Sequence, residues 1–424
     1  MPVPLDRLFD YAAHGIDTGW IGCRVCVPFG RRRLVGVVAD IGLAEAAQAR
    51  IRPIHQRLDD TPLLAGELLA TLRWVAAYYH HPLGEVLATA LPAPLRAARP
   101  LPQVGETWLR LSAEGRQALA DARPRRGSRL AALLQRLGEG ARPASFLDVE
   151  LPGWRGSARL PRARAWFDWR EGAMAAETPM PTIAGPPLNP EQTQALAAVC
   201  NALDGFRGFL LDGVTGSGKT EVYLGAIERV LAAGRQALVL VPEIALTPQL
   251  LRRFRERLGG RVLTLHSSLA DGERARVWLA AARGEAGVVL GTRSAVFVPL
   301  AKCGLIVIDE EHDSALKQAD RLRYSARDLA LVRGRALGVP VLLGSATPSL
   351  ESLANVESGR LQRLALPRRA GAARPPAVRV LDLRGKRLID GLAPELIDAM
   401  QARLARNEQV LVFRNRRGFA PLLA

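Results

Sequence analysis

A glycine-rich stretch at residues 213–220 carries the most specific chemistry in this sequence. It reads Gly213-Val-Thr-Gly-Ser-Gly-Lys-Thr220 and fits the pattern G-x-x-x-x-G-K-[ST] of a phosphate-binding loop. In such a loop the glycines let backbone amides turn inward, where they and the positive end of the next helix bind polyphosphate oxygens. We therefore expect a nucleoside triphosphate here, with Lys219 against the β- and γ-phosphates and Thr220 on Mg²⁺. The residues expected to hold the nucleotide are Gly213, Thr215, Gly216, Ser217, Gly218, Lys219 and Thr220.

Acidic residues follow a buried apolar run at residues 305–308. Asp309 is expected to hold the Mg²⁺ that it shares with Thr220, and Glu310 to orient and deprotonate the attacking water, with His312 closing the same catalytic group. Acids after an apolar run can also be an ordinary strand end, but the phosphate loop in the same chain favours the catalytic interpretation. Small hydroxyl residues in Gly344-Ser-Ala-Thr-Pro-Ser349 follow the next apolar run, where they are expected to hydrogen-bond these acids and a neighbouring domain.

The elements that must position these groups alternate between strand and helix from Leu188 onward. Continuous apolar strands separated by amphipathic helices predict a parallel sheet covered on both faces. Its carboxyl edge is where such sheets bind ligands. Asn189 and Pro190 fit the cap and first position of a helix before the loop. The expected strands are 209–211, 237–241, 262–265, 287–290, 305–308 and 341–343, and a further strand, helix and strand are expected at 378–383, 394–406 and 410–413.

The first 180 residues have a different pattern. Two β-rich runs at 22–30 and 31–40 predict a hairpin whose turn carries three arginines, and an apolar stripe predicts a helix over 63–79. Proline-rich residues 92–102 predict a linker. Residues 103–180 combine short helices with a β ribbon, which suggests a winged-helix module. Further linkers are expected at 178–187 and 368–376.

Composition points to a polyanionic partner. The 424 residues carry 58 Lys and Arg against 41 Asp and Glu, a net charge of +17, which favours nucleic acid over a merely well-solvated surface. Four cysteines are too few for a disulfide scaffold, and Cys23 and Cys26 lie on a predicted strand, where we expect neither metal nor redox chemistry. The sequence shows neither a signal peptide nor an apolar run long enough for a membrane span, so we expect a cytoplasmic protein without membrane contact.

The ordered set of motifs resembles superfamily 2 helicases: Gln192 before the loop, the phosphate loop, the DExH box at 309–312 and the Ser-Ala-Thr segment. It resembles more narrowly the PriA family of replication-restart helicases, also called primosomal protein N′. The segments that carry this narrower resemblance are Val3-Pro-Leu-Asp-Arg-Leu-Phe-Asp-Tyr11, Tyr79-His-His-Pro-Leu-Gly-Glu85, Leu240-Val-Pro-Glu-Ile-Ala-Leu-Thr-Pro-Gln249, Gly291-Thr-Arg-Ser-Ala-Val-Phe297 and Phe413-Arg-Asn-Arg-Arg-Gly-Phe-Ala-Pro421.

The resemblance implies four parts. They are a β-rich 3′-end DNA-binding domain at 1–97, a winged-helix-like domain at 98–180, an α/β RecA-like helicase lobe 1 at 185–370, and the start of a second RecA-like lobe at 375–424. It also implies an ATP- and Mg²⁺-dependent 3′→5′ DNA helicase that recognises stalled or abandoned forks and initiates primosome assembly. The implied partners are forked and single-stranded DNA, primosome proteins and single-strand-binding protein, and the chain is expected to be a monomer. By the same resemblance Gln192 reads adenine, and Phe9, Asp10 and Gly30 form a pocket for a DNA 3′ end.

Two departures from the family pattern stand out. Leu316 occupies a position after the DExH box where the family carries an aromatic residue, which is expected to weaken coupling between DNA and ATP. The zinc-binding cysteine cluster and most of lobe 2 would follow Pro421, and the sequence stops at Ala424. We therefore expect a chain that binds ATP and fork DNA without efficient unwinding. The alternatives are a fork-binding module whose ATP site barely hydrolyses and a superfamily 2 translocase of another pathway.

Overall fold

The computed structural model describes residues 1–42, 51–102, 107–125, 127–171, 183–259, 262–370 and 377–413. The chain divides into two compact units, Met1–Ala372 and Ala373–Ala424. The functional residues predicted from the sequence lie in the first unit.

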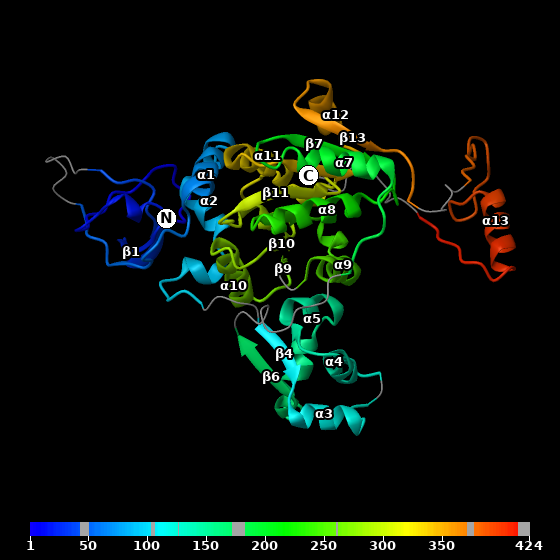
Figure 1. Cartoon of the computed structure of the whole chain (residues 1–424), viewed down its shortest axis with the longest axis horizontal. Helices are drawn as coiled ribbons and strands as arrows, with labels where there is room; N and C mark the ends of the chain where they lie inside the picture. Colours follow the sequence, from blue (N-terminus) through cyan, green and yellow to red (C-terminus); the bar gives the residue numbers. More distant parts are fainter. Residues whose placement is uncertain are drawn as a thin grey trace. The chain divides into compact units, whose positions relative to one another are not determined.

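A seven-stranded sheet, in which every neighbouring pair is parallel, forms the centre of the first unit (Figure 1). Its strands in spatial order are β13 (Leu361–Leu366), β7 (Gly208–Gly213), β12 (Val341–Ser345), β11 (Cys303–Asp309), β8 (Gln236–Leu240), β10 (Val288–Gly291) and β9 (Val262–Leu265). The α/β RecA-like lobe expected from the sequence is confirmed. The edge strand β13 was not expected, because the polar pair Gln362 and Arg363 interrupts its apolar residues and it lies outside the run of predicted strands.

Helices cover both faces of this sheet, and alternate strand residues serve the two sides. Leu238 and Leu240 of β8 join one core cluster, while Ala237 and Val239 join the other. One face is covered by α7 (Pro190–Cys200), α8 (Lys219–Ala232) and α9 (Pro248–Leu258), and the other by α10 (Asp271–Ala282) and α11 (Ala326–Leu337). A short helix, α12 (Leu350–Glu357), follows β12.

The N-terminal residues form the predicted hairpin and then join the core of the large sheet. The hairpin is β1 (Arg24–Phe29) and β2 (Arg32–Val37), and β1 also pairs with β3 (Gln56–Arg57). Helices α1 (Gly66–Tyr78) and α2 (Leu83–Ala90) share one hydrophobic cluster with α10 and α11. The expected linker at 92–102 is wrong at its start, because the 3₁₀ helix at Ala93–Arg96 buries Leu95 completely in that same cluster.

Residues 107–171 form a small module with its own core. Three antiparallel strands, in the order β5 (Arg142–Pro143), β4 (Thr107–Leu111) and β6 (Phe167–Glu171), pack with short helices. These are α3 (Ala113–Ala120), α4 (Arg129–Gly138), α5 (Ala144–Glu150) and α6 (Trp154–Ala158). Ser112 and Ser128 cap α3 and α4, because each hydroxyl accepts a backbone N–H of the first turn. The arrangement is winged-helix-like, as expected.

The second unit differs from the expectation. Its helix α13 (Pro394–Leu404) forms, but residues 378–383 and 410–413 are not strands in the described part 377–413. Val378, Val380 and Phe413 are 84%, 88% and 86% exposed. The apolar pattern that predicted strands therefore has no partner strand among the described residues, and a strand without a partner is not stable. Residues 414–424 lie outside the described residues. None of the described helices is both long and apolar enough to cross a membrane.

Candidate nucleotide site

The phosphate loop joins β7 to α8 through two glycines in the left-handed region. Gly216 and Gly218 have φ of +79° and +81°, a conformation that favours glycine. A Cβ on Gly218 would lie 2.3 Å from Nε2 of Gln192, and one on Gly213 would lie 2.5 Å from Oγ of Ser217. Backbone conformation therefore requires glycine at 216, close packing requires it at 213, and both require it at 218.

Polar groups inside the loop fit a polyphosphate ligand. Lys219 is 8% exposed, and its Nζ donates to the Gly213 carbonyl at 2.9 Å. The Ser217 hydroxyl is buried and has no hydrogen-bond partner among the described residues. A buried donor without a partner is costly unless a ligand satisfies it. Together with the positive end of α8, these groups form a cradle for phosphate oxygens.

The two acids expected to act on the nucleotide lie at the carboxyl edge of the same sheet. β12 is the only strand between β7 and β11, so the loop and Asp309 are neighbours. The Tyr223 hydroxyl of α8 donates to Asp309 Oδ1 at 2.9 Å. Burial raises the pKa of Asp309, and the hydrogen bond from Tyr223 opposes that rise. Burial, and then the charge of Asp309, also raise the pKa of Glu310.

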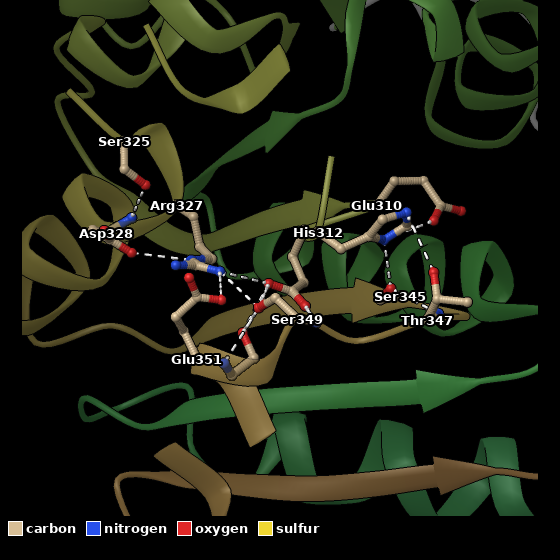
Figure 2. A network of polar contacts seen from close by, with 11 residues as sticks. Glu310, His312, Ser325, Arg327, Asp328, Ser345, Thr347, Ser349 and Glu351 are labelled. Carbon is tan, nitrogen blue, oxygen red and sulfur yellow. Dashed lines mark hydrogen bonds and ion pairs between the residues drawn. The ribbon is translucent and has the colours of Figure 1, made fainter. Parts of the chain in front are cut away.

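His312 connects the acid box to the Ser-Ala-Thr segment that begins with Ser345, the last residue of β12 (Figure 2). Its Nδ1 lies 2.7 Å from Oγ of Ser345, and its Nε2 lies 3.3 Å from Oγ1 of Thr347. Glu310 Oε2 lies 3.6 Å from His312 Nδ1. The sequence led us to expect hydroxyl contacts to the acids, and Ser349 makes one, to Glu311. Ser345 and Thr347 instead contact the imidazole of His312 and fix it beside the predicted catalytic carboxylate.

Gln192 lies beneath the phosphate loop. It is 4% exposed; its Oε1 accepts from the Asn189 N–H in a capping box, and its Nε2 donates to the Ser217 carbonyl at 2.8 Å. Both ends of the amide are therefore bonded to this chain. The adenine-reading role of Gln192 stays a prediction, whereas its support of the loop is visible in these contacts.

Sequence reasoning missed three side chains that organise the site. Tyr223 follows the loop by three residues, Glu311 lies within the acid box, and Arg327 is in α11. Glu311 and Arg327 form an ion pair at 3.2 Å, and the Glu311 side chain is fully buried. The only signal in the sequence was the pair of acids at 310 and 311, which suggested that one of them has a structural role. The motif does not show which of the two faces the ligand.

Leu316, where we expected a departure from the family pattern, is well packed. Leu316 is 3% exposed and belongs to the main core cluster. Nη1 of Arg293 donates to the carbonyls of Ala315 and Lys317, each at 3.0 Å. Burial raises the pKa of the nearby Tyr324 to about 12. The functional effect of Leu316 stays a prediction.

A cavity of about 910 Å³ lies in the N-terminal region and is lined by Phe9 and Asp10. The Phe9 ring meets Phe29 edge-on, with centroids 5.4 Å apart, and the Arg7 guanidinium lies 4.9 Å from the Phe9 centroid. Gly30 is not among the lining residues; it occupies the β1–β2 turn with φ of +61° and open space around it. The structure thus brings two of the three predicted pocket residues to one cavity.

Comparison with known proteins adds two matches along the chain. Residues 1–92 match the 3′DNA-binding domain (3′BD) of PriA, and residues 189–356 match the DEAD/DEAH box helicase family. The replication restart protein PriA of Haemophilus influenzae is 40% identical over 443 aligned residues, which cover 100% of this chain and 59% of that protein. The PriA of Bacillus subtilis is 43% identical over 240 residues, covering 55% of this chain and 30% of the relative. The PriA of Chlamydia pneumoniae is 33% identical, covering 98% of this chain and 57% of the relative.

Proposed function

We propose that this chain, which belongs to the PriA family of replication-restart helicases, binds ATP and Mg²⁺ at the carboxyl edge of its parallel sheet and uses them on DNA. The observation that carries the proposal is that the phosphate loop after β7 and the acids Asp309 and Glu310 at the end of β11 lie at the same edge of the sheet, with only β12 between the two strands. Phosphoryl transfer needs positioning and charge neutralisation more than covalent chemistry, and this arrangement supplies both.

Each residue has a distinct role in this proposal. The loop amides and Lys219 bind the phosphates, and Thr220 and Asp309 hold Mg²⁺, which neutralises developing charge. Glu310 orients the attacking water and accepts its proton. His312 ties this acid to the Ser345–Thr347 segment, so that a movement of that segment reaches the site.

The DNA part of the proposal rests on the N-terminal cavity and the charge of +17. We propose that the cavity takes the 3′ end of a DNA strand, with Phe9 stacking on a base and Asp10 accepting from the terminal hydroxyl. Recognition of stalled forks, movement in the 3′→5′ direction, and assembly with primosome proteins and single-strand-binding protein are proposed from family membership.

The chain spans 59% of the length of its Haemophilus influenzae relative, so unwinding is proposed for the whole protein. Superfamily 2 hydrolysis uses an arginine from a second lobe, worth roughly 10³ to 10⁵ in rate. The described residues hold one parallel sheet of the RecA-like kind. We therefore propose that residues 1–424 alone bind ATP and fork DNA but hydrolyse ATP slowly. DNA-stimulated phosphate release at several per second by the purified chain would refute this.

Replacement of Lys219 tests the nucleotide site. Lys219→Ala should abolish binding of a fluorescent ATP analogue, while affinity for forked DNA changes little. Arg229→Ala is the matched control, because Arg229 is an exposed cation on the same helix. Equal ATP affinity in Lys219→Ala and the parent chain would refute the site.

Replacement of Asp10 tests the DNA pocket separately. The parent chain should prefer forks whose strand ends in a 3′-hydroxyl over those ending in a 3′-phosphate, and Asp10→Ala should lose that preference at constant salt. Asp17→Ala, in the same region but outside the cavity lining, is the control. Indifference of the parent chain to end chemistry would contradict the pocket.

A further inference from the structure

The carboxylate of Glu311 is a fully buried charge that the proposed nucleotide chemistry does not use. It accepts four hydrogen bonds. The Ser349 N–H donates at 2.7 Å and the Ser349 hydroxyl at 3.0 Å, while Ser352 Oγ donates at 2.8 Å and Arg327 Nη1 at 3.2 Å. A buried carboxylate is tolerated when its oxygens are satisfied in this way. The group is therefore a fixed point between three elements, β11, α11 and α12.

Glu310, the neighbouring residue, has an unusual backbone conformation. Its φ is +48°, in the left-handed region that residues with a Cβ avoid. Such a conformation costs of order 1–3 kcal/mol and persists only where the surrounding structure enforces it. Strain of this kind often accompanies functional sites, so what enforces it at Glu310 matters for the chemistry.

The residues on both sides of Glu310 are anchored in different directions. Asp309 pairs in register with Gly344 of β12, and its side chain accepts from Tyr223 of α8. Glu311 donates its N–H to the Gly344 carbonyl at 3.0 Å, and its side chain accepts from Arg327 of α11. Because α8 and α11 lie on opposite faces of the sheet, the backbone has to turn between these anchors, and it turns at Glu310.

The partners of Glu311 are themselves held. Arg327 also binds Asp328 at 3.0 Å and the Ser349 hydroxyl at 2.7 Å, and it lies 4.0 Å from Glu351 (Figure 2). Ser349 caps α12, because its Oγ accepts the Ser352 N–H. The same segment carries Ser345 and Thr347, which contact His312. One carboxylate thus fixes both the turn at Glu310 and the segment that holds His312.

We infer that Glu311 is a positioning residue: its buried carboxylate, bound by Arg327, Ser349 and Ser352, holds Glu310 in the left-handed conformation that aims the Glu310 carboxylate at the attacking water. This inference rests on the proposed function, because it assigns a support to the proposed catalytic base. It predicts that loss of the Glu311 charge damages hydrolysis and leaves nucleotide affinity intact.

The test compares Glu311→Gln with a matched control in the purified chain. Glu351→Gln is that control, because Glu351 lies near the same arginine but its side chain is 71% exposed. The single-turnover rate of ATP hydrolysis and the Kd for an ATP analogue are measured, together with the ratio of affinities for ADP with aluminium fluoride and for ADP alone. The last ratio reports transition-state geometry without turnover. Glu310→Gln sets the rate expected when the base itself is removed.

We expect Glu311→Gln to lower the hydrolysis rate on the order of 10²-fold, the scale of a misplacement of about 1 Å. The aluminium fluoride preference should fall with the rate, while the Kd and the Glu351→Gln control stay at the parent values. Ser352→Ala removes one hydrogen-bond donor to Glu311 and keeps the Glu311 charge. It should lower the hydrolysis rate and the aluminium fluoride preference as well, but by less than Glu311→Gln. This variant provides the test if Glu311→Gln does not fold.

Three results are distinguishable. A parent chain that binds no ATP analogue refutes the proposed function itself. A parent chain that binds the analogue, with Glu311→Gln or Ser352→Ala matching the control in rate and in aluminium fluoride preference, overturns the inference. A loss confined to Kd also overturns it, because it shows a structural role in nucleotide binding and no positioning of Glu310.

Discussion

Asp309 is the carboxylate proposed to bind Mg²⁺. Among the described side chains, only the Tyr223 hydroxyl donates a hydrogen bond to it. Tyr223 is 1% exposed, and burial together with the Asp309 charge raises its own pKa well above the usual value, so it remains a donor. Gly344 leaves room for this contact, since a Cβ there would lie 1.5 Å from the Tyr223 oxygen. The glycine before the Ser-Ala-Thr segment thus has a steric reason that its motif alone did not reveal.

Tyr223→Phe should therefore shift the pH dependence of Mg²⁺-nucleotide binding. Burial already raises the pKa of Asp309, and loss of the hydrogen bond from Tyr223, which opposes that rise, raises it further. Binding needs ionised Asp309, so it should fail at a higher pH in the variant as the solution is acidified. Nucleotide titrations between pH 4.5 and 8 measure this. Tyr324→Phe, another buried tyrosine of the same lobe, should leave the curve unchanged; an unshifted curve for Tyr223→Phe contradicts the role.

At the scale of elements, α11 joins the N-terminal helices to the lobe. Arg333 of α11 is 1% exposed and binds Glu67 of α1 through two hydrogen bonds of 2.9 Å each, besides the carbonyls of Val296 and Val298. The apolar stripe predicted the helix at 63–79 correctly. Its packing partner could not be predicted. The stripe shows which face of the helix is buried, but it does not show that α11, more than 200 residues away in the sequence, covers that face.

Removal of Glu67 should destabilise the first unit strongly. Glu67→Ala leaves a buried guanidinium without its carboxylate, which costs roughly 3–5 kcal/mol, whereas replacing both partners by apolar residues is often close to neutral. Urea unfolding should show that loss for Glu67→Ala and partial recovery for Glu67→Met with Arg333→Met. Glu85→Ala, from a partly exposed pair with His81, should cost about 1 kcal/mol or less. Equal costs for Glu67→Ala and Glu85→Ala would refute the buried pair.

The winged-helix-like module contacts the lobe through a second charge cluster. Arg155 of α6 binds Asp148 of α5 at 2.6 Å and also Glu273 of α10. The Trp154 indole N–H donates to Asp148 at 2.9 Å. Burial outweighs these partners and raises the pKa of Asp148 from 3.8 to about 6. The sequence predicted short helices in this module but not the contact of Arg155 with Glu273, because a single charged residue on a short helix is usually exposed to solvent.

This shift predicts a pH-dependent stability. The folded chain binds a proton at Asp148 more tightly than the unfolded chain, so the contribution of Asp148 is complete below about pH 3.8 and disappears as the pH rises to about 6. Asp148→Asn cannot titrate. The stability of the parent relative to this variant should fall between about pH 4 and 6 and stay level above. Urea midpoints across that range measure it, with Asp168→Asn, from a half-exposed pair, as control. A constant difference between parent and Asp148→Asn contradicts the raised pKa.

At the scale of the whole molecule, the pattern of apolar residues predicted the strands that are buried in the sheet. Six of the sheet strands contain buried runs that are apolar throughout or, in β9, interrupted only by Thr264, so they were expected and are found. Residues 410–413 are also a continuous apolar run, and residues 378–383 are apolar except for Arg379 and Asp382. Neither stretch forms a strand, because strand stability comes from neighbouring strands more than from intrinsic preference. The motif order likewise predicted that loop and acids meet. It could not predict Glu311 or Arg327, since their role depends on which face of the sheet each side chain reaches.

The positive charge that dominates the sequence should make DNA binding depend on salt. Arg31, Arg32 and Arg33 are exposed at the end of the β1–β2 hairpin: Arg31 lies in the turn, where all three were expected, and Arg32 and Arg33 begin β2. If they bind DNA phosphates, replacing all three with serine should lower the slope of log affinity against log salt. The expected decrease is about 0.7 to 0.9 for each phosphate that the variant no longer neutralises, a total of about two to three. Binding of forked DNA across a salt series, followed by fluorescence anisotropy, measures that slope.

A charge-matched control separates phosphate binding from bulk charge. Arg229, Arg283 and Arg360 are also exposed, and they lie dispersed over the lobe. Their replacement removes the same net charge from a chain of +17 and should weaken binding slightly without a comparable change in slope, because counterion release follows phosphates actually neutralised. Equal slopes for the two triple variants would show that the hairpin turn binds no phosphates and that the DNA path lies elsewhere on the basic surface.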